Sequence, residues 1–167
     1  MNTLLYNETM LKKFEIYPTR ISVRYQWQEI KNSAEGYDNS HLYLKSIPRK
    51  GLGVFSKKDL KEGDIIELCH SAPIETPSRW MRDSGIKKYS YWDPDGRGLI
   101  PFGFGCIYNS ADRENLKNIT YHMFVEDRLM VFIATKDIPA GEELITWWGE
   151  GYYKSWCDAS NKPITDN

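Results

Sequence analysis

The sequence Gly105-Cys-Ile-Tyr-Asn-Ser-Ala-Asp-Arg-Glu-Asn115 and the sequence Asp137-Ile-Pro-Ala-Gly-Glu-Glu-Leu-Ile-Thr-Trp-Trp-Gly149 enclose the stretch that decides the fold. Between them lie two alternating apolar runs, Ile119–Val125 and Leu129–Ala134, joined by Glu126-Asp-Arg128. Two such runs with a short polar connection are typical of a β-hairpin. The stretch therefore predicts a hairpin placed between two turn-rich segments.

Upstream of this stretch the chain continues as short apolar runs separated by turns. The pattern predicts upstream strands at Leu42–Lys45, Gly53–Ser56, Ile65–Cys69 and Arg97–Phe102. A last strand is predicted at Leu144–Trp147, within the closing segment itself. Thr76-Pro77 combines a capping residue with proline at the first helical position, which predicts a helix over Thr76–Ser84. Many short strands with one helix favour a mainly β domain.

Three segments together resemble one family. Ser46-Ile-Pro-Arg-Lys-Gly-Leu-Gly-Val-Phe-Ser56 is similar to the G-x-G-V-F-A opening of the SET-domain protein lysine methyltransferases. The Asn109–Asn115 segment resembles their N-H-S-x-x-P-N motif, and Gly141–Gly149 resembles their G-E-E-L…Y-G closing motif. The resemblance spans residues 41–153. It implies a SET-domain fold, with several small curved sheets, a C-terminal pseudoknot and few short helices, and it is nearest to short stand-alone members of viral or bacterial type.

The resemblance also divides the chain. Residues 1–38 precede it and are expected to form an N-terminal extension, with a short helix and an alternating strand that pack on the domain. Residues 39–167 are expected to form the SET domain together with an aromatic C-terminal tail. Aromatic residues in both terminal regions make a homodimer one possible arrangement.

Members of the family transfer a methyl group from S-adenosylmethionine to a lysine amine of a protein or peptide. The reaction needs in-line alignment and exclusion of water. It also needs a neutral amine, although free lysine has a pKa of about 10.4. A narrow aromatic channel beside a positive charge favours the neutral amine. For this chemistry, aromatic side chains and main-chain atoms matter more than an acid–base pair.

The resemblance assigns the cofactor to two segments and the tail. Glycines let a backbone approach a ligand closely, so the run of residues from Lys50 through Gly51 and Leu52 to Gly53 is expected beside the methionine part. The resemblance implies that Asn109 and Ser110 bind the cofactor. The family usually has histidine at position 110 but uses its backbone to recognise the adenine, so the contact is expected to survive the change to serine. Tyr153 belongs to the aromatic tail that is expected to stack on the adenine.

The catalytic position of the family is also changed. Its tyrosine corresponds to Trp148, and indole offers a donor nitrogen but no hydroxyl. Tyr108 and Tyr91 are therefore candidate phenols beside Trp148, with Tyr89 and Tyr152 as further candidates. The residues taken as catalytic are Trp148, Tyr108 and Tyr91.

Composition excludes some other classes. The chain has 22 basic and 23 acidic residues, a net charge of −1 and no long basic run, so nucleic acid is not an expected partner. The pattern predicts no membrane span and no secretory signal. His41, His70 and His122 share no ligand spacing, so no metal is expected. A reduced cytoplasm, or the interior of a host cell for a viral protein, is the expected location.

Two other functions remain open at this point. A SET fold with changed residues at positions 110 and 148 could bind a peptide, S-adenosylmethionine or both without transferring a methyl group. A structural subunit whose aromatic tail packs on a partner is a third possibility. Sequence does not give the substrate protein or the number of methyl groups added.

Overall fold

The computed structural model describes residues 38–48, 50–74 and 85–150 of the 167-residue chain. The predicted N-terminal extension, the Thr76–Ser84 helix and the aromatic tail that includes Tyr153 lie almost wholly outside these residues. Along the described part, the elements are β1 (Leu42–Ile47), β2 (Gly51–Ser56), β3 (Ile65–Ile74), η1 (Gly85–Tyr89), β4 (Tyr91–Trp92), β5 (Gly98–Pro101), η2 (Gly103–Cys106), β6 (Asn109–Ser110), η3 (Glu114–Leu116), β7 (Ile119–Phe124), β8 (Leu129–Ala134) and β9 (Ile145–Thr146). The η elements are short 3₁₀ turns, and the rest of this part is strand or irregular, which confirms a mainly β domain.

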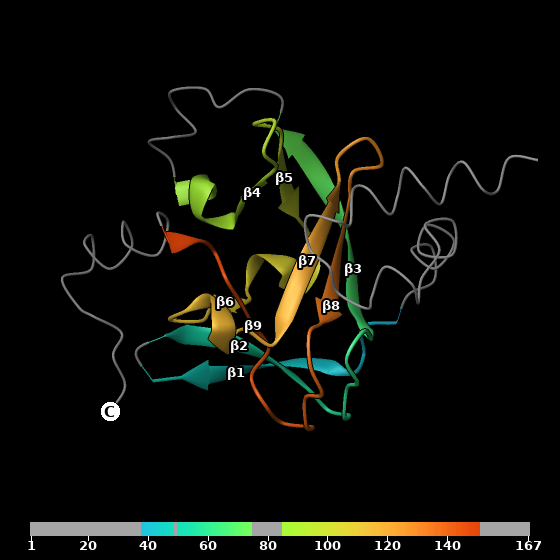
Figure 1. Cartoon of the computed structure of the whole chain (residues 1–167), viewed down its shortest axis with the longest axis vertical. Helices are drawn as coiled ribbons and strands as arrows, with labels where there is room; N and C mark the ends of the chain where they lie inside the picture. The colour runs from blue at the N-terminus through green and yellow to red at the C-terminus, as the bar shows by residue number, and fades with distance from the viewer. Residues whose placement is uncertain (1–37, 49, 75–84, 151–167) are drawn as a thin grey trace, which may run out of the picture.

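The largest sheet has the order β4-β5-β3-β8-β7 and is antiparallel throughout (Figure 1). Strand β3 is longer than predicted because it pairs with β8 through its first half and with β5 through its second half. A register shift between Ile65 and Glu67 marks a bulge in β3. Because a bulge re-aims the side chains beside it, Ile66 and Glu67 are both fully buried.

The predicted hairpin is confirmed as β7 and β8, with its turn at residues 125–128. Every residue of β8 is buried. Met130 and Phe132 belong to the main hydrophobic cluster, whereas Val131 and Ile133 belong to a second cluster on the other face. A strand buried on both faces explains the unbroken apolar sequence Leu129–Ala134.

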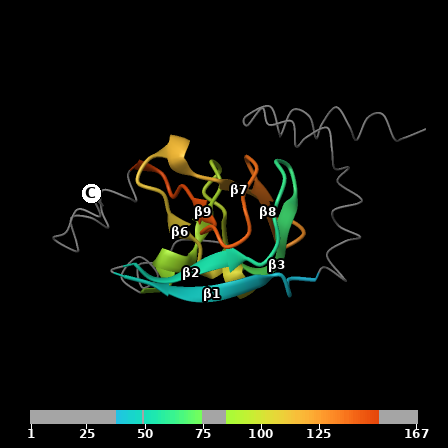
Figure 2. The same ribbon diagram turned by 90° about the horizontal axis from the view of Figure 1, so that it is seen from below.

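Two small sheets complete the described part. Strands β1 and β2 form a hairpin that lies across one side of the domain, below the β6–β9 pair in Figure 2. Strands β6 and β9 are parallel, with Asn109 opposite Ile145 and Ser110 opposite Thr146. The closing segment is thereby inserted beside the Asn109 segment, which is the pseudoknot that the resemblance implies.

The buried Asn118 anchors this insertion. Its side-chain amide donates to the Glu143 carbonyl at 2.7 Å, and its Oδ1 accepts the Ile145 N–H at 2.8 Å. The Leu144 N–H also donates to the Val54 carbonyl of β2 at 2.8 Å. The closing segment is therefore held on two sides by hydrogen bonds that the alternation of apolar residues does not reveal.

The glycine-spaced segment Gly103–Cys106 folds into the η2 turn. A side-chain carbon at Gly105 would lie 2.8 Å from the Cys69 sulfur and 2.9 Å from the Phe132 ring. Glycine at this position thus allows η2 to pack directly on the core. Within the described residues, no helix is long and apolar enough to cross a membrane.

Candidate active site

Asn109 connects the three sequence segments that carry the resemblance. Its side-chain amide donates to the Leu52 carbonyl at 3.1 Å and to Oε1 of Glu143 at 2.8 Å. Leu52 belongs to β2, and Glu143 follows the turn at Gly141. One side chain therefore fixes the positions of all three segments. Sequence analysis did not single out Glu143 for this contact.

The glycines of the Lys50–Gly53 run have different reasons to be glycine. A side-chain carbon at Gly53 would collide with Ile47 and lie 2.8 Å from Oε1 of Glu143, so this site is closed by the protein itself. Gly51 has φ +86°, and a side-chain carbon there would meet only open space. The backbone around Gly51 is consequently accessible, and the Leu52 side chain beside it is 51% exposed.

Ser110 and Trp148 are joined across the β6–β9 pair. The backbone N–H of Trp148 donates to the Ser110 hydroxyl oxygen at 3.3 Å, and the backbone N–H of Ala111 donates to the Thr146 carbonyl at 2.7 Å. The serine that replaces the family's histidine therefore has a side-chain role in placing Trp148. This contact connects two of the positions at which the sequence departs from the family pattern.

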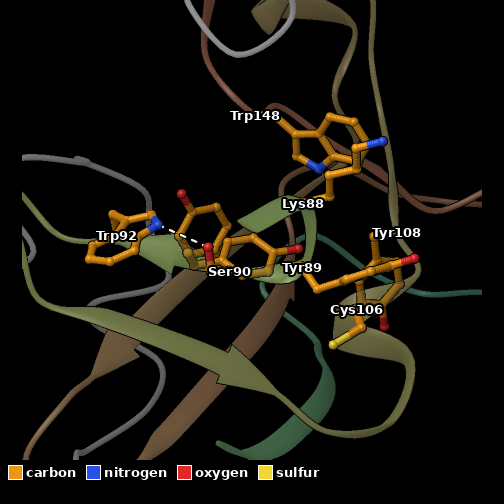
Figure 3. Close-up of a pocket in the computed structure, with 9 residues that line it drawn as sticks. Lys88, Tyr89, Ser90, Trp92, Cys106, Tyr108 and Trp148 are labelled. Carbon is orange, nitrogen blue, oxygen red and sulfur yellow. Dashed lines mark hydrogen bonds between the residues drawn. The ribbon is translucent and has the colours of Figure 1, made fainter. Parts of the chain in front are cut away.

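A cavity of about 240 Å³ opens beside Trp148 (Figure 3). Of the lining residues that the structure describes, six are aromatic and the others are a lysine, a serine and a cysteine. They are Lys88, Tyr89, Ser90, Tyr91, Trp92, Cys106, Tyr108, Tyr121 and Trp148. The three residues taken as catalytic from sequence, Trp148, Tyr108 and Tyr91, thus share one cavity.

Tyr91 forms a fixed part of the cavity wall. Its hydroxyl donates to the Gly105 carbonyl at 2.9 Å. Its ring packs edge-on against Tyr121, with 4.7 Å between the centroids, and against Phe132 at 5.9 Å. Burial raises the pKa of the Tyr91 hydroxyl well above its ordinary value, because the phenolate would be poorly solvated there. Tyr91 therefore remains a neutral phenol.

Tyr108 is fixed by Glu67, which sequence analysis did not single out. The Tyr108 hydroxyl donates to Oε2 of Glu67 at 3.0 Å, and the Phe104 N–H donates to Oε1 at 2.9 Å. Burial raises the pKa of Glu67, whereas these donors favour its charged form. Burial also raises the pKa of Tyr108 well above its ordinary value. The sequence alone does not reveal the contact between Glu67 and Tyr108, because Glu67 is a single acidic residue within the apolar strand β3.

The cavity wall at its lysine side is a short hydrogen-bonded turn. The Ser90 hydroxyl donates to the Lys87 carbonyl at 2.8 Å and accepts the Trp92 indole N–H at 2.9 Å. Cys106 is half-buried and lines the cavity. Its thiol donates to the Pro101 carbonyl, and burial raises the pKa of the thiol.

The predicted cofactor residues form a second group next to the cavity. Tyr108 in the cavity wall directly precedes Asn109. Asn109 in turn is hydrogen-bonded to the Leu52 carbonyl, so it adjoins the Lys50–Gly53 run. Tyr153 lies outside the described residues.

Four residues of the cavity lining were not predicted as site residues, namely Lys88, Ser90, Trp92 and Tyr121. The only available signal was the dense run of aromatics after Lys88. Within the described ranges, no group of histidine, cysteine and acidic side chains could hold a metal ion.

The fold and this arrangement define a SET domain. A family model of the SET domain matches residues 51–149, which is more than half of the chain, and the protein belongs to this family. The SET family generally consists of protein lysine methyltransferases. No curated protein sequence matches the chain.

Solved structures agree with this assignment. A Plasmodium falciparum protein assigned as a histone methyltransferase is 26% identical, with a TM-score of 0.54, over 68% of this chain and 96% of that one. CpSET8 from Cryptosporidium has a TM-score of 0.56 at 18% identity, over 76% of this chain and 68% of its own, and shares the fold.

Proposed function

We propose that this SET domain transfers a methyl group from S-adenosylmethionine to a lysine side chain of a protein, and that the lysine enters the aromatic cavity. The observation that carries this proposal is the shared cavity of Tyr91, Tyr108 and Trp148. It directly adjoins Asn109, which joins the three family segments. The assignment of the Plasmodium neighbour as a histone methyltransferase supports a protein substrate.

The residues near Asn109 fit the cofactor. Open space over Gly51 and the exposed Leu52 leave the backbone of this run free to lie along a ligand. Both amide hydrogens of Asn109 are already donated to Leu52 and Glu143. Its Oδ1 atom is therefore the part of the side chain left for the cofactor. Lys50 and Ser110 complete this proposed binding surface, with Tyr153 from the tail, whereas Gly53 is closed off by Ile47 and Glu143 and only allows the run to pack there.

When bound, S-adenosylmethionine supplies a methyl group activated by a positively charged sulfur. The aromatic cavity supplies the conditions that the amine needs. Its walls remove water from the incoming lysine and so penalise the ammonium form. A neighbouring positive charge adds to this penalty. The cavity thus lowers the pKa of the substrate amine and aligns the neutral nitrogen for attack.

The two fixed phenols orient this nitrogen. Each hydroxyl proton is already donated, that of Tyr91 to the Gly105 carbonyl and that of Tyr108 to Glu67. Each phenol oxygen therefore faces an amine as an acceptor, which leaves the nitrogen lone pair free for the methyl group. Trp148 contributes a flat wall, and a ring face attracts an ammonium group before it loses its proton.

The test is transfer of labelled methyl groups from S-adenosylmethionine into core histones and into a cell lysate, with cofactor binding measured by calorimetry. We expect labelled lysine with the native chain and at least a tenfold lower rate with Tyr91→Phe. Tyr43→Phe is the matched control, because that phenol stacks on Phe55 outside the cavity and its loss leaves the rate unchanged.

A second function is favoured by the same cavity. Trp148 stands where the family has a phenol, so the fold could bind lysine and cofactor without catalysing transfer. Heat of cofactor binding together with an absence of label in every substrate would support this binding module. Absence of both heat and label would contradict the cofactor assignment itself.

A further inference from the structure

One lysine of this chain lines the proposed lysine cavity. Among the described residues that line the cavity, Lys88 is the one lysine, and it shares this lining with Trp148 (Figure 3). The backbone N–H of Trp148 is hydrogen-bonded to the Ser110 hydroxyl, and Tyr108 directly precedes Asn109. The end of the cavity formed by Trp148 and Tyr108 therefore adjoins the proposed cofactor surface. A lysine of the protein itself is thus part of the cavity that the substrate lysine is proposed to enter.

The turn that carries Lys88 is held against the cavity. The Ser90 N–H and the Ser90 hydroxyl both donate to the Lys87 carbonyl, at 3.3 Å and 2.8 Å. The Trp92 indole donates to the same hydroxyl at 2.9 Å. Ser90 therefore connects the Lys87 carbonyl, directly before Lys88, to a wall residue on β4. The backbone on either side of Lys88 is thus hydrogen-bonded, while its side chain is exposed.

The neighbouring lysine differs in position. Lys87 belongs to the same 3₁₀ turn but is not part of the cavity lining. In the part of the chain that the structure describes, no carboxylate forms an ion pair with Lys88 that would hold its amine away from the cavity. The aliphatic stem of lysine packs well on aromatic surface, so the cavity suits this side chain.

We propose that Lys88 is a methyl acceptor of its own chain, modified in cis within the Trp148 cavity. This inference rests on the proposed methyltransferase function. The neutral Lys88 nitrogen forms a bond to the methyl carbon as the carbon–sulfur bond of S-adenosylmethionine breaks. The bonding pair leaves with sulfur to give S-adenosylhomocysteine, and the extra proton on nitrogen passes to water.

Attachment to the cavity wall gives Lys88 an advantage over a free substrate. A tethered group has an effective concentration set by its reach and not by its bulk concentration. The rate per molecule is therefore independent of protein concentration. A methylated amine keeps its positive charge and remains attracted to the face of Trp148. A modified Lys88 would consequently continue to occupy the cavity and compete with an added substrate.

The experiment incubates the full chain with deuterated-methyl S-adenosylmethionine and maps the mass increase on peptides from a protease that does not cut at lysine. We expect the label on Lys88, at a rate per molecule that is unchanged over a tenfold dilution. Lys88→Arg should remove this label and Lys87→Arg should leave it. Core histones added in parallel report transfer to another protein.

Three results would overturn the inference. Labelled histones with an unmodified Lys88 would refute it and leave the proposed function intact. An absence of label in both would refute the inference and, if calorimetry shows no cofactor binding, the proposed function too. A labelling rate that falls in proportion to dilution would show transfer between molecules and refute modification in cis.

Discussion

The side-chain amide of Asn109 donates to the Glu143 carboxylate at 2.8 Å, and this contact fixes the closing segment against β6. Asn109→Asp should lower the free energy of unfolding by about 3 kcal/mol, because two carboxylates then face each other and Leu52 loses its donor. Urea unfolding measures the change.

The double variant Asn109→Asp with Glu143→Gln tests the cause. A glutamine amide can donate to the new aspartate, so the pair should recover about half of the lost stability. Equal stability of the single and double variants would show that repulsion between positions 109 and 143 is not the source of the loss.

Asn118 gives a second prediction about the pseudoknot. Its amide donates to the Glu143 carbonyl and its Oδ1 accepts the Ile145 N–H, all in a buried position. Asn118→Asp replaces the donor with a buried charge facing a carbonyl oxygen, and should cost about 3 kcal/mol or more. The exposed Asn115→Asp, three residues earlier, should change stability by less than about 0.5 kcal/mol. Similar losses in both variants would argue against a specific role of Asn118.

His122 on β7 predicts a dependence of stability on pH. Burial lowers its pKa from 6.5 to about 4, because the charged imidazole is poorly solvated there. The unfolded chain then binds a proton at a higher pH than the folded chain, so His122 makes stability fall between pH 6.5 and about 4. The full effect is about 3 kcal/mol.

Comparison of variants isolates this effect. His122→Gln should flatten the decline in this pH range, while the exposed His70→Gln should leave it unchanged. The raised pKa of Glu67 acts in the opposite direction, since a folded state that holds its proton more tightly gains stability as pH falls. Glu67 is present in all three proteins, so the difference between their curves belongs to the histidine. Parallel curves would contradict the buried assignment of His122.

Periodicity predicted the parts of this fold that local patterns control. Strand β8 has the predicted bounds because an unbroken apolar run between turns has few other solutions. The parallel β6–β9 pair followed only from family resemblance, because two-residue strands have no periodicity. Glu67 and Lys88 illustrate what neither source reveals. Glu67 is an acidic residue inside an apolar run, and its contact with Tyr108 leaves no pattern in the sequence. Lys88 has the sequence context of an ordinary surface lysine, and only the fold shows that it lines the cavity.

Trp148 provides the prediction that bears most directly on catalysis. Tyr91 and Tyr108 line the same cavity and are the acceptors in the proposed mechanism, so the indole is expected to serve as a wall and not as a substitute hydroxyl. Trp148→Tyr and Trp148→Phe both make the wall smaller and admit water, which weakens the desolvation of the amine. Each variant should therefore lower the methyl-transfer rate about tenfold.

The contrast between these two variants decides the role of the indole. If the missing hydroxyl of the family's tyrosine limits the native enzyme, Trp148→Tyr should raise the rate and Trp148→Phe should not. If the wall matters, both rates fall by similar factors, because the two rings differ only in that hydroxyl. Single-turnover rates with saturating S-adenosylmethionine separate this effect from a change in cofactor affinity. A rate increase confined to the tyrosine variant would overturn the assignment of Tyr91 and Tyr108 as sufficient acceptors.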